Sequence, residues 1–259
     1  MWVYDVDKNL TTAGGSSVIK SNGSYNYTFR AYSNFELMQS EVYGAGYGSG
    51  SLAGIYIEAN NAKIFGSIIK DGYYGIYLQS ANNANISTNI VRDNNLDGIF
   101  LASGSNRNVI ENNNLSYNAD EGIEIGSNGG VNNTIRLNRI INNSCGGVNS
   151  GGIVISDANN TVFSNVIADN GNNGDEYGIY LTSNAYGTNI SNNNISNNND
   201  DNVNIESYNN KIVNNNITYA REEGIQVIQG AYNNTIRENY IENTTSFGIF
   251  IQSDNNSLI

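Results

Sequence analysis

The feature that most constrains this chain is a motif that returns about every 24 residues from Gly54 to the C-terminus. Each copy starts with Gly-Ile-x-Φ or a close variant, where Φ is an aliphatic residue, and then has two single aliphatic residues that lie five positions apart. The copies start at Gly54, Gly75, Gly98, Gly122, Gly152, Gly178, Asn202, Gly224 and Gly248. Self-similarity at a period of about 20–50 residues is typical of solenoid proteins.

The apolar residues within one copy predict three short strands. In the copy that starts at Gly178, the first strand carries Ile179 and Leu181, the second Ile190 and the third Ile195. Apolar residues alternate over a few positions between Gly and Asn, and no window shows a helical period. Three strands per coil predict an all-β fold, a right-handed parallel β-helix of about nine to ten coils at the ~4.8 Å strand spacing.

The chain divides into two predicted parts. Residues 1–24 are rich in Gly, Ser and Thr and are expected to form an N-terminal cap, whereas residues 25–259 form the parallel β-helix as one elongated domain. Asn255 to Ile259 begin a further strand and stop without a polar cap, which exposes strand edges. We expect either a fragment of a longer β-helix or a protomer that stacks end to end.

Asparagine makes up about one residue in five and recurs at a fixed offset. Three residues after the second aliphatic come Ser67, Asn89, Asn113, Asn138, Asn165, Asn193, Asn215 and Asn239, and the same offset in an earlier, degenerate coil gives Ser40. Stacked coil on coil, their amides would bond to one another along the axis, which predicts a structural ladder. A second, weaker column follows at Asn94, Asn118, Asn143, Asn170 and Asn198.

Charge and composition limit the partners and the compartment. The net charge of −12 argues against nucleic acid and anionic membrane surfaces, and the absence of an 18-residue apolar run argues against membrane insertion. The single cysteine, Cys145, excludes an internal disulfide framework. An extracellular or cell-surface location is expected, where Asn-x-Ser/Thr sites can carry glycans. The candidates are Asn9, Asn22, Asn26, Asn132, Asn159, Asn233 and Asn243.

The recurring Gly-Ile-Tyr-Leu and Asn-Asn-Thr-Ile motifs, as at Gly178–Leu181 and Asn233–Ile236, resemble the repeats of the pectin-lyase-like superfamily. They are most similar to NosD-like and surface β-helix proteins of methanogenic archaea. The resemblance covers residues 25–259 and implies the architecture. It implies no single activity, because that superfamily includes lyases, hydrolases, epimerases, tailspikes, adhesins and surface-layer proteins. The NosD association with copper does not fit a chain with no His, two Met and one Cys.

Outward positions between the paired core residues of each first strand form a lengthwise stripe that contains several aromatic residues. The candidates for stacking on sugar rings are Tyr56, Tyr77, Phe100, Tyr180 and Phe250. Aromatic residues also pair well across neighbouring strands, so the same stripe can be explained by packing alone.

The turn before this stripe is acidic. Its carboxyl groups are Asp97, Asp120, Glu121, Asp175, Glu176, Asp200, Asp201, Glu222 and Glu223. Asp120 and Glu121, with Glu124 of the stripe, are candidates for the acid and base of glycoside hydrolysis. Asp175, Glu176, Asp200 and Asp201 are candidates for a calcium site, since calcium prefers oxygen ligands. A solvated acidic turn is the third interpretation.

The leading hypothesis is a secreted or cell-surface β-helix with a structural or adhesive role. It would associate with itself end to end or with flanking coils and bind polysaccharide. It would need no cofactor, and calcium is the one candidate ion. The competing hypothesis is a polysaccharide-active enzyme, a glycoside hydrolase, lyase or epimerase, that uses carboxylates around Glu124. A lyase is disfavoured because the basic residues are scattered along the chain.

Overall fold

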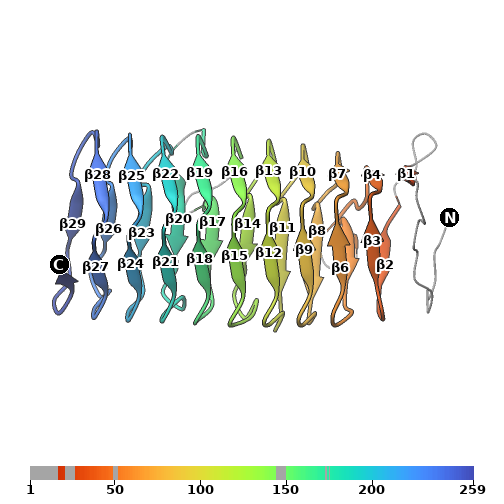
Figure 1. Ribbon diagram of the computed structural model, residues 1–259, viewed down its shortest axis with the longest axis horizontal. Helices are drawn as coiled ribbons and strands as arrows, with labels where there is room; N and C mark the ends of the chain where they lie inside the picture. Colours follow the sequence, from red (N-terminus) through yellow and green to blue (C-terminus); the bar gives the residue numbers. More distant parts are fainter. Residues whose placement is uncertain (1–16, 21–26, 49–51, 144–149, 173, 175) are drawn as a thin grey trace.

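A computed structural model describes the chain except for residues 1–16, 21–26, 49–51, 144–149, 173 and 175. The described residues form a rod in which thirty short strands build three parallel sheets of ten strands each, and the first and last described strands lie at opposite ends (Figure 1). The predicted all-β solenoid is confirmed. None of the described residues belongs to a helix long and apolar enough to cross a membrane.

Sheet I contains the third aliphatic residue of each coil. Its strands are β1 (Val18–Lys20), β4 (Glu41–Tyr43), β7 (Ile68–Lys70), β10 (Ile90–Arg92), β13 (Asn114–Ser116), β16 (Arg139–Ile141), β19 (Val166–Ala168), β22 (Asn194–Ser196), β25 (Asn216–Thr218) and β28 (Tyr240–Glu242). Strand β1 lies within the segment predicted as a cap and pairs with β4, so the regular sheet begins before residue 25.

Sheet II contains the Ile-x-Φ pieces. Its strands are β2 (Phe29–Ala31), β5 (Ile55–Ile57), β8 (Ile76–Gln79), β11 (Ile99–Ala102), β14 (Ile123–Ile125), β17 (Ser150–Ile155), β20 (Glu176–Leu181), β23 (Val203–Ile205), β26 (Ile225–Val227) and β29 (Ile249–Ile251). Strands β17 and β20 extend over six residues, and they follow the two longest spacings between copies of the motif, from Gly122 to Gly152 and from Gly152 to Gly178.

Sheet III contains the second aliphatic residue. Its strands are β3 (Glu36–Met38), β6 (Lys63–Phe65), β9 (Asn85–Ser87), β12 (Val109–Glu111), β15 (Thr134–Arg136), β18 (Thr161–Phe163), β21 (Asn189–Ser191), β24 (Lys211–Val213), β27 (Thr235–Arg237) and β30 (Ser257–Leu258).

The register stacks identical core positions on one another. Ile76, Ile99 and Ile123 are Cα partners on adjacent strands, and all three have no exposed surface. Each buried aliphatic side chain contributes about 1.5–3 kcal/mol. Because one coil buries only a few of them, the fold depends on the stacking of many coils.

The predicted asparagine ladder is present along the corner between sheets III and I. Both the backbone N–H and Nδ2 of Asn89 donate to Oδ1 of Asn113, at 2.9 and 3.0 Å, and Nδ2 also donates to the Ile64 carbonyl of the preceding coil at 2.9 Å. Ser40 and Ser67 occupy the first two positions, as predicted. Buried amides at this corner are therefore satisfied along the axis.

Two further ladders occupy the other corners. The weaker column is confirmed between sheets I and II, where Nδ2 of Asn94 donates to Oδ1 of Asn118 at 2.8 Å. The third ladder, between sheets II and III, was not predicted. Its members lie two residues before the second aliphatic: Asn108, Asn133, Asn160, Asn210, Asn234 and Asn256. Thr188 takes the place of an asparagine and interrupts it.

The residue before a ladder residue often has a positive φ, as at Asn112 (55°) and Asn192 (56°). Asparagine tolerates this left-handed conformation better than most residues with a side chain. The frequent Asn-Asn pairs therefore have a double explanation, because the first residue makes the corner and the second enters the ladder.

Candidate functional site

Two columns of side chains run side by side on the outer face of sheet II. The strand column consists of the middle residues of the strands: Tyr56, Tyr77, Phe100, Glu124, Val154, Tyr180, Asn204, Gln226 and Phe250. The turn column lies three residues earlier in each coil: Ala53, Tyr74, Asp97, Glu121, Gly151, Tyr177, Asp201, Glu223 and Phe247. Side chains of the same coil, and of neighbouring coils, can meet across the two columns.

Aromatic pairs and polar clusters alternate along these columns. The ring centroids of Tyr74 and Tyr77 lie 5.3 Å apart, and those of Tyr177 and Tyr180 lie 5.1 Å apart. Phe247 and Phe250 form a third pair at 5.1 Å. The intervals between these pairs contain the carboxyl groups of the columns.

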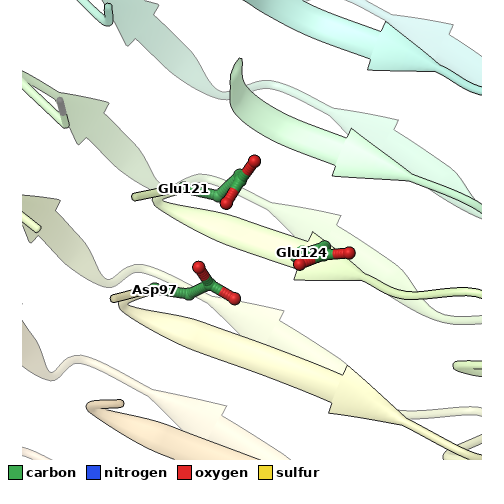
Figure 2. A group of neighbouring side chains, drawn as sticks. All are labelled: Asp97, Glu121 and Glu124. Carbon is green, nitrogen blue, oxygen red and sulfur yellow. The ribbon is translucent and has the colours of Figure 1, made fainter. Parts of the chain in front are cut away.

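Asp97, Glu121 and Glu124 form the acidic triad. One carboxylate oxygen from each residue lies within 4.8 Å of the other two, and among the described residues this is the only such group of three acidic, His or Cys side chains. Figure 2 shows Asp97 and Glu121 at the beginning of neighbouring strands and Glu124 farther along the strand that follows Glu121. Parallel register brings Phe100 of the Asp97 coil beside Glu124.

Burial and mutual repulsion raise the pKa values of the acidic triad. Burial raises the pKa of Asp97 well above its ordinary value, and the charges of Glu121 and Glu124 add to this effect. Burial, then Asp120 and Glu124, raise the pKa of Glu121 to about 9. Burial, then Asp120, raise the pKa of Glu124 to about 7. Only Glu124 is partly exposed, since Asp97 and Glu121 are 2% and 6% exposed.

The second acidic cluster lies four strands further along sheet II and is differently satisfied. Oδ1 of Asp201 accepts the backbone N–H of Glu223 at 2.9 Å, and Oδ2 accepts Nδ2 of Asn204 at 3.0 Å. Glu223 accepts the hydroxyl of Ser246 at 2.9 Å. Burial, followed by the side-chain hydrogen bond with Glu223, raises the pKa of Asp201 to about 8.

The predicted sugar-stacking residues fall into two groups. Tyr56, Tyr77 and Tyr180 are only 5–8% exposed and contact neighbouring rings or acids, so little of their surface is available to a ligand. Phe100 and Phe250 are partly exposed. The sequence prediction missed Phe247, whose side chain is more than half exposed beside Phe250.

The predicted catalytic candidates lie together. Of the predicted calcium residues, the described Glu176, Asp200 and Asp201 belong to no group of three converging acidic, His or Cys side chains. Asp120 is half-buried, and its charge acts on Glu121 and Glu124. The backbone N–H of Asn172 and the amide of Asn199 donate to Glu176, and the Asp200 N–H donates to the Glu176 carbonyl. Asp175 lies outside the described residues, so calcium binding at that set stays a prediction.

Asp97 was predicted as a member of the acidic turn and was not among the individually named catalytic or calcium candidates. Asp97 and Glu121 both stand directly before the Gly-Ile of successive coils, and this shared position was the available signal. Of the predicted glycan acceptors, the described residues Asn132, Asn159, Asn233 and Asn243 are exposed. Asn9, Asn22 and Asn26 lie outside the described residues, as does Cys145.

The sequence matches the family model described as "Right handed beta helix region" over residues 15–177 and 177–259. No curated protein sequence matches it significantly. The superfamily resemblance seen in the repeats agrees with this match and with the solved structures that share the fold.

Three solved structures illustrate the likeness. The A-module of a mannuronan C-5 epimerase from Azotobacter vinelandii is 16% identical with a TM-score of 0.71, over 88% of this chain and 64% of that one. A periplasmic alginate epimerase is 16% identical with a TM-score of 0.73, over 90% and 61%. An alginate lyase from Paenibacillus is 20% identical with a TM-score of 0.66, over 84% and 80%. This chain thus spans less than two thirds of the two epimerase chains, and the likeness concerns the fold.

Proposed function

Because the chain belongs to the right-handed beta helix region family, we propose that its rod is a scaffold that binds polysaccharide along the outer face of sheet II, in a structural or adhesive role at the cell exterior. The observation that carries this proposal is the alternation of aromatic pairs and polar clusters along the strand and turn columns. Sugar polymers offer both hydroxyl groups and apolar ring faces, and such a surface matches both.

The strand spacing supports a polymer rather than a small ligand. Side chains of one column recur at about 4.8 Å, a distance comparable to one sugar unit of an extended chain. The partly exposed rings Phe100 and Phe250 lie six strands apart on sheet II, so a single chain contacting both would run along the rod. By their titles, two of the similar structures named above act on alginate and one on mannuronan, which is a further reason to test acidic polysaccharides.

Affinity electrophoresis in native gels that contain alginate, pectate or a neutral glucan tests this proposal. We expect at least one polysaccharide to retard the protein, and replacement of Phe247 and Phe250 by Ala to weaken the retardation at least fivefold. Tyr240→Ala is the matched control, because Tyr240 is an aromatic residue of similar exposure on sheet I. Absence of retardation by every polysaccharide, or equal weakening by the control, would overturn the proposal.

A polysaccharide-cleaving enzyme is the second candidate. The observation in its favour is that oxygens of Glu121 and Glu124 lie within 4.8 Å of each other, close to the ~5–5.5 Å separation of the carboxyl pair in retaining glycosidases. Assays for new reducing ends and for unsaturated products on the same polysaccharides test it. Turnover that Glu124→Gln abolishes while retardation persists would establish the enzyme; binding without turnover favours the scaffold.

Self-association stays a prediction. Light scattering on a concentration series of the purified chain tests it, and a particle mass that remains that of one chain would contradict it.

A further inference from the structure

We propose that the acidic triad binds a divalent cation, and that calcium is the best-fitting ion. The first argument is geometric. Calcium binds oxygen ligands at about 2.3–2.6 Å, so two ligands of one ion lie at most about 5 Å apart. The three carboxylate oxygens of Asp97, Glu121 and Glu124 all satisfy this limit, since they lie within 4.8 Å of one another.

The second argument is the unmatched negative charge. No Lys or Arg in the described part of the chain forms an ion pair with any of the three carboxylates. At an effective dielectric constant of about 20, two unit charges at about 5 Å repel by about 3 kcal/mol, and burial adds a desolvation cost. A bound divalent cation removes both penalties.

The third argument is independent of the charge. Oδ2 of Asp97 is fully buried, and no hydrogen-bond donor reaches it in the described structure. Buried polar atoms are nearly always partnered, and among the unpartnered side-chain atoms of the described residues this oxygen is the one that belongs to a group of converging carboxylates, so it indicates an absent ligand. Figure 2 shows the carboxyl group of Asp97 directed toward Glu121 and Glu124.

The ligand type selects the ion. Three carboxylates and no nitrogen or sulfur ligand favour a hard cation. Magnesium usually keeps several of its waters, whereas calcium accepts six to eight oxygens in flexible geometry, including bidentate carboxylates. A buried group of protein carboxylates therefore favours calcium. Water completes the coordination on the side of Glu124, the one partly exposed member.

Isothermal titration of the chelator-treated protein with calcium chloride, without any glycan, tests the proposal. We expect one ion per chain and a rise of the thermal midpoint, because the ion binds only the folded state. Glu121→Gln and Glu124→Gln should each weaken binding at least tenfold, and magnesium should bind at least tenfold more weakly than calcium. Glu223→Gln is the matched control, since it removes an equally buried carboxyl from the second acidic cluster.

Two results would overturn the proposal. One is the absence of both heat and midpoint shift in the unmodified protein, and the other is calcium binding that survives both glutamate substitutions. Should Glu121→Gln fail to fold, Glu124→Gln decides, because its side chain is partly exposed and outside the core. Since no polysaccharide is present, failure here leaves the proposed function standing, and failure of glycan binding leaves the cation site standing.

Discussion

The acidic triad and the second acidic cluster occupy equivalent positions of the same two columns, yet they are satisfied in different ways. In the first coil of each group, Asp97 and Phe100 correspond to Asp201 and Asn204. In the next coil, Glu121 and Glu124 correspond to Glu223 and Gln226. In the second acidic cluster, the amides of Asn204 and Gln226 take the places of the Phe100 ring and the Glu124 carboxyl group. Both oxygens of Asp201 consequently have donors, whereas Oδ2 of Asp97 has none.

This difference shows how a repeat protein separates architecture from chemistry. The backbone places carboxyl groups at the same two positions four strands apart, a distance of about 19 Å at the ~4.8 Å strand spacing. In the second acidic cluster, Nδ2 of Asn204 donates to Asp201 and to Gln226, so both Asp201 oxygens have donors, although Oδ1 of Asn204 is itself buried without a partner. In the acidic triad, Glu124 stands where the second acidic cluster has the Gln226 amide. The carboxylates of the triad therefore need protons or a cation to neutralise their charge.

The largest expected effect comes from breaking the hydrogen bonds that Asn204 donates in the second acidic cluster. Asn204→Ala removes the donor to Asp201 and the donor to Gln226, and a buried acceptor without a partner costs about 1–3 kcal/mol. We expect the free energy of unfolding in urea to fall by about 2–3 kcal/mol. Asn184→Ala, an exposed asparagine in another turn, should change it by less than about 0.5 kcal/mol. Equal stability of the two variants would show that the Asn204 bonds do not stabilise the fold.

The second prediction makes the acidic triad resemble the second acidic cluster. Glu124→Gln converts the pair Glu121 and Glu124 into the equivalent of Glu223 and Gln226. In chelator, at a pH above about 9 where the carboxyl groups of Glu121 and Glu124 are both ionised, it removes the repulsion between them and should stabilise the protein by about 1–2 kcal/mol. In excess calcium the order should reverse, because the unmodified protein gains binding energy that the variant lacks.

Urea unfolding in both conditions measures this reversal. Glu222→Gln, an exposed acid beside the second acidic cluster, should show none. A Glu124→Gln protein that is less stable in chelator and in calcium alike would mean that Glu124 serves the fold through other contacts.

The architecture could be predicted because the same pattern of apolar and asparagine residues recurs in nearly every coil. Isoleucines such as Ile179 and Ile190 mark the strands in nearly every coil, and the Asn89-type offset marks one corner. The third ladder was missed because alanines at 62 and 84 and Thr188 interrupt its column, so fewer coils carry the signal. The role of positive φ at residues such as Asn192 becomes evident only with the backbone.

The candidate site was less predictable, because it depends on burial. The acidic turn and the stripe were both recognised, but sequence does not distinguish a solvated carboxyl from one such as Asp97, which is 2% exposed. It also does not reveal that Tyr77 is covered by neighbouring rings while Phe247 is exposed. The three-residue step between the two columns brings Glu121 and Glu124 together, and this was visible only as proximity in sequence.

The third prediction compares the two clusters by pH. The folded-state pKa of Asp201 is raised to about 8, so between pH ~4 and ~8 the native state holds a proton that the unfolded chain has lost. Its contribution to the unfolding free energy is therefore present at low pH and declines as pH rises, by at most about 1.4 kcal/mol per unit. Asp201→Asn should flatten this decline, measured by urea unfolding at fixed calcium. Asn184→Ala should keep the unmodified slope, and an unchanged slope in Asp201→Asn would contradict the assignment.

The smallest effect is expected at Asp120, which adjoins the acidic triad but does not belong to it. Its charge acts on Glu121 and Glu124 from a half-buried position. Asp120→Asn should therefore weaken calcium binding less than tenfold, and the loss should shrink as salt is raised, because screening reduces interactions between partly exposed charges. Titrations at low and high ionic strength measure this. A loss as large as that of Glu121→Gln, persisting in high salt, would make Asp120 a fourth ligand, and the difference between the two clusters would then extend beyond the columns into the turn itself.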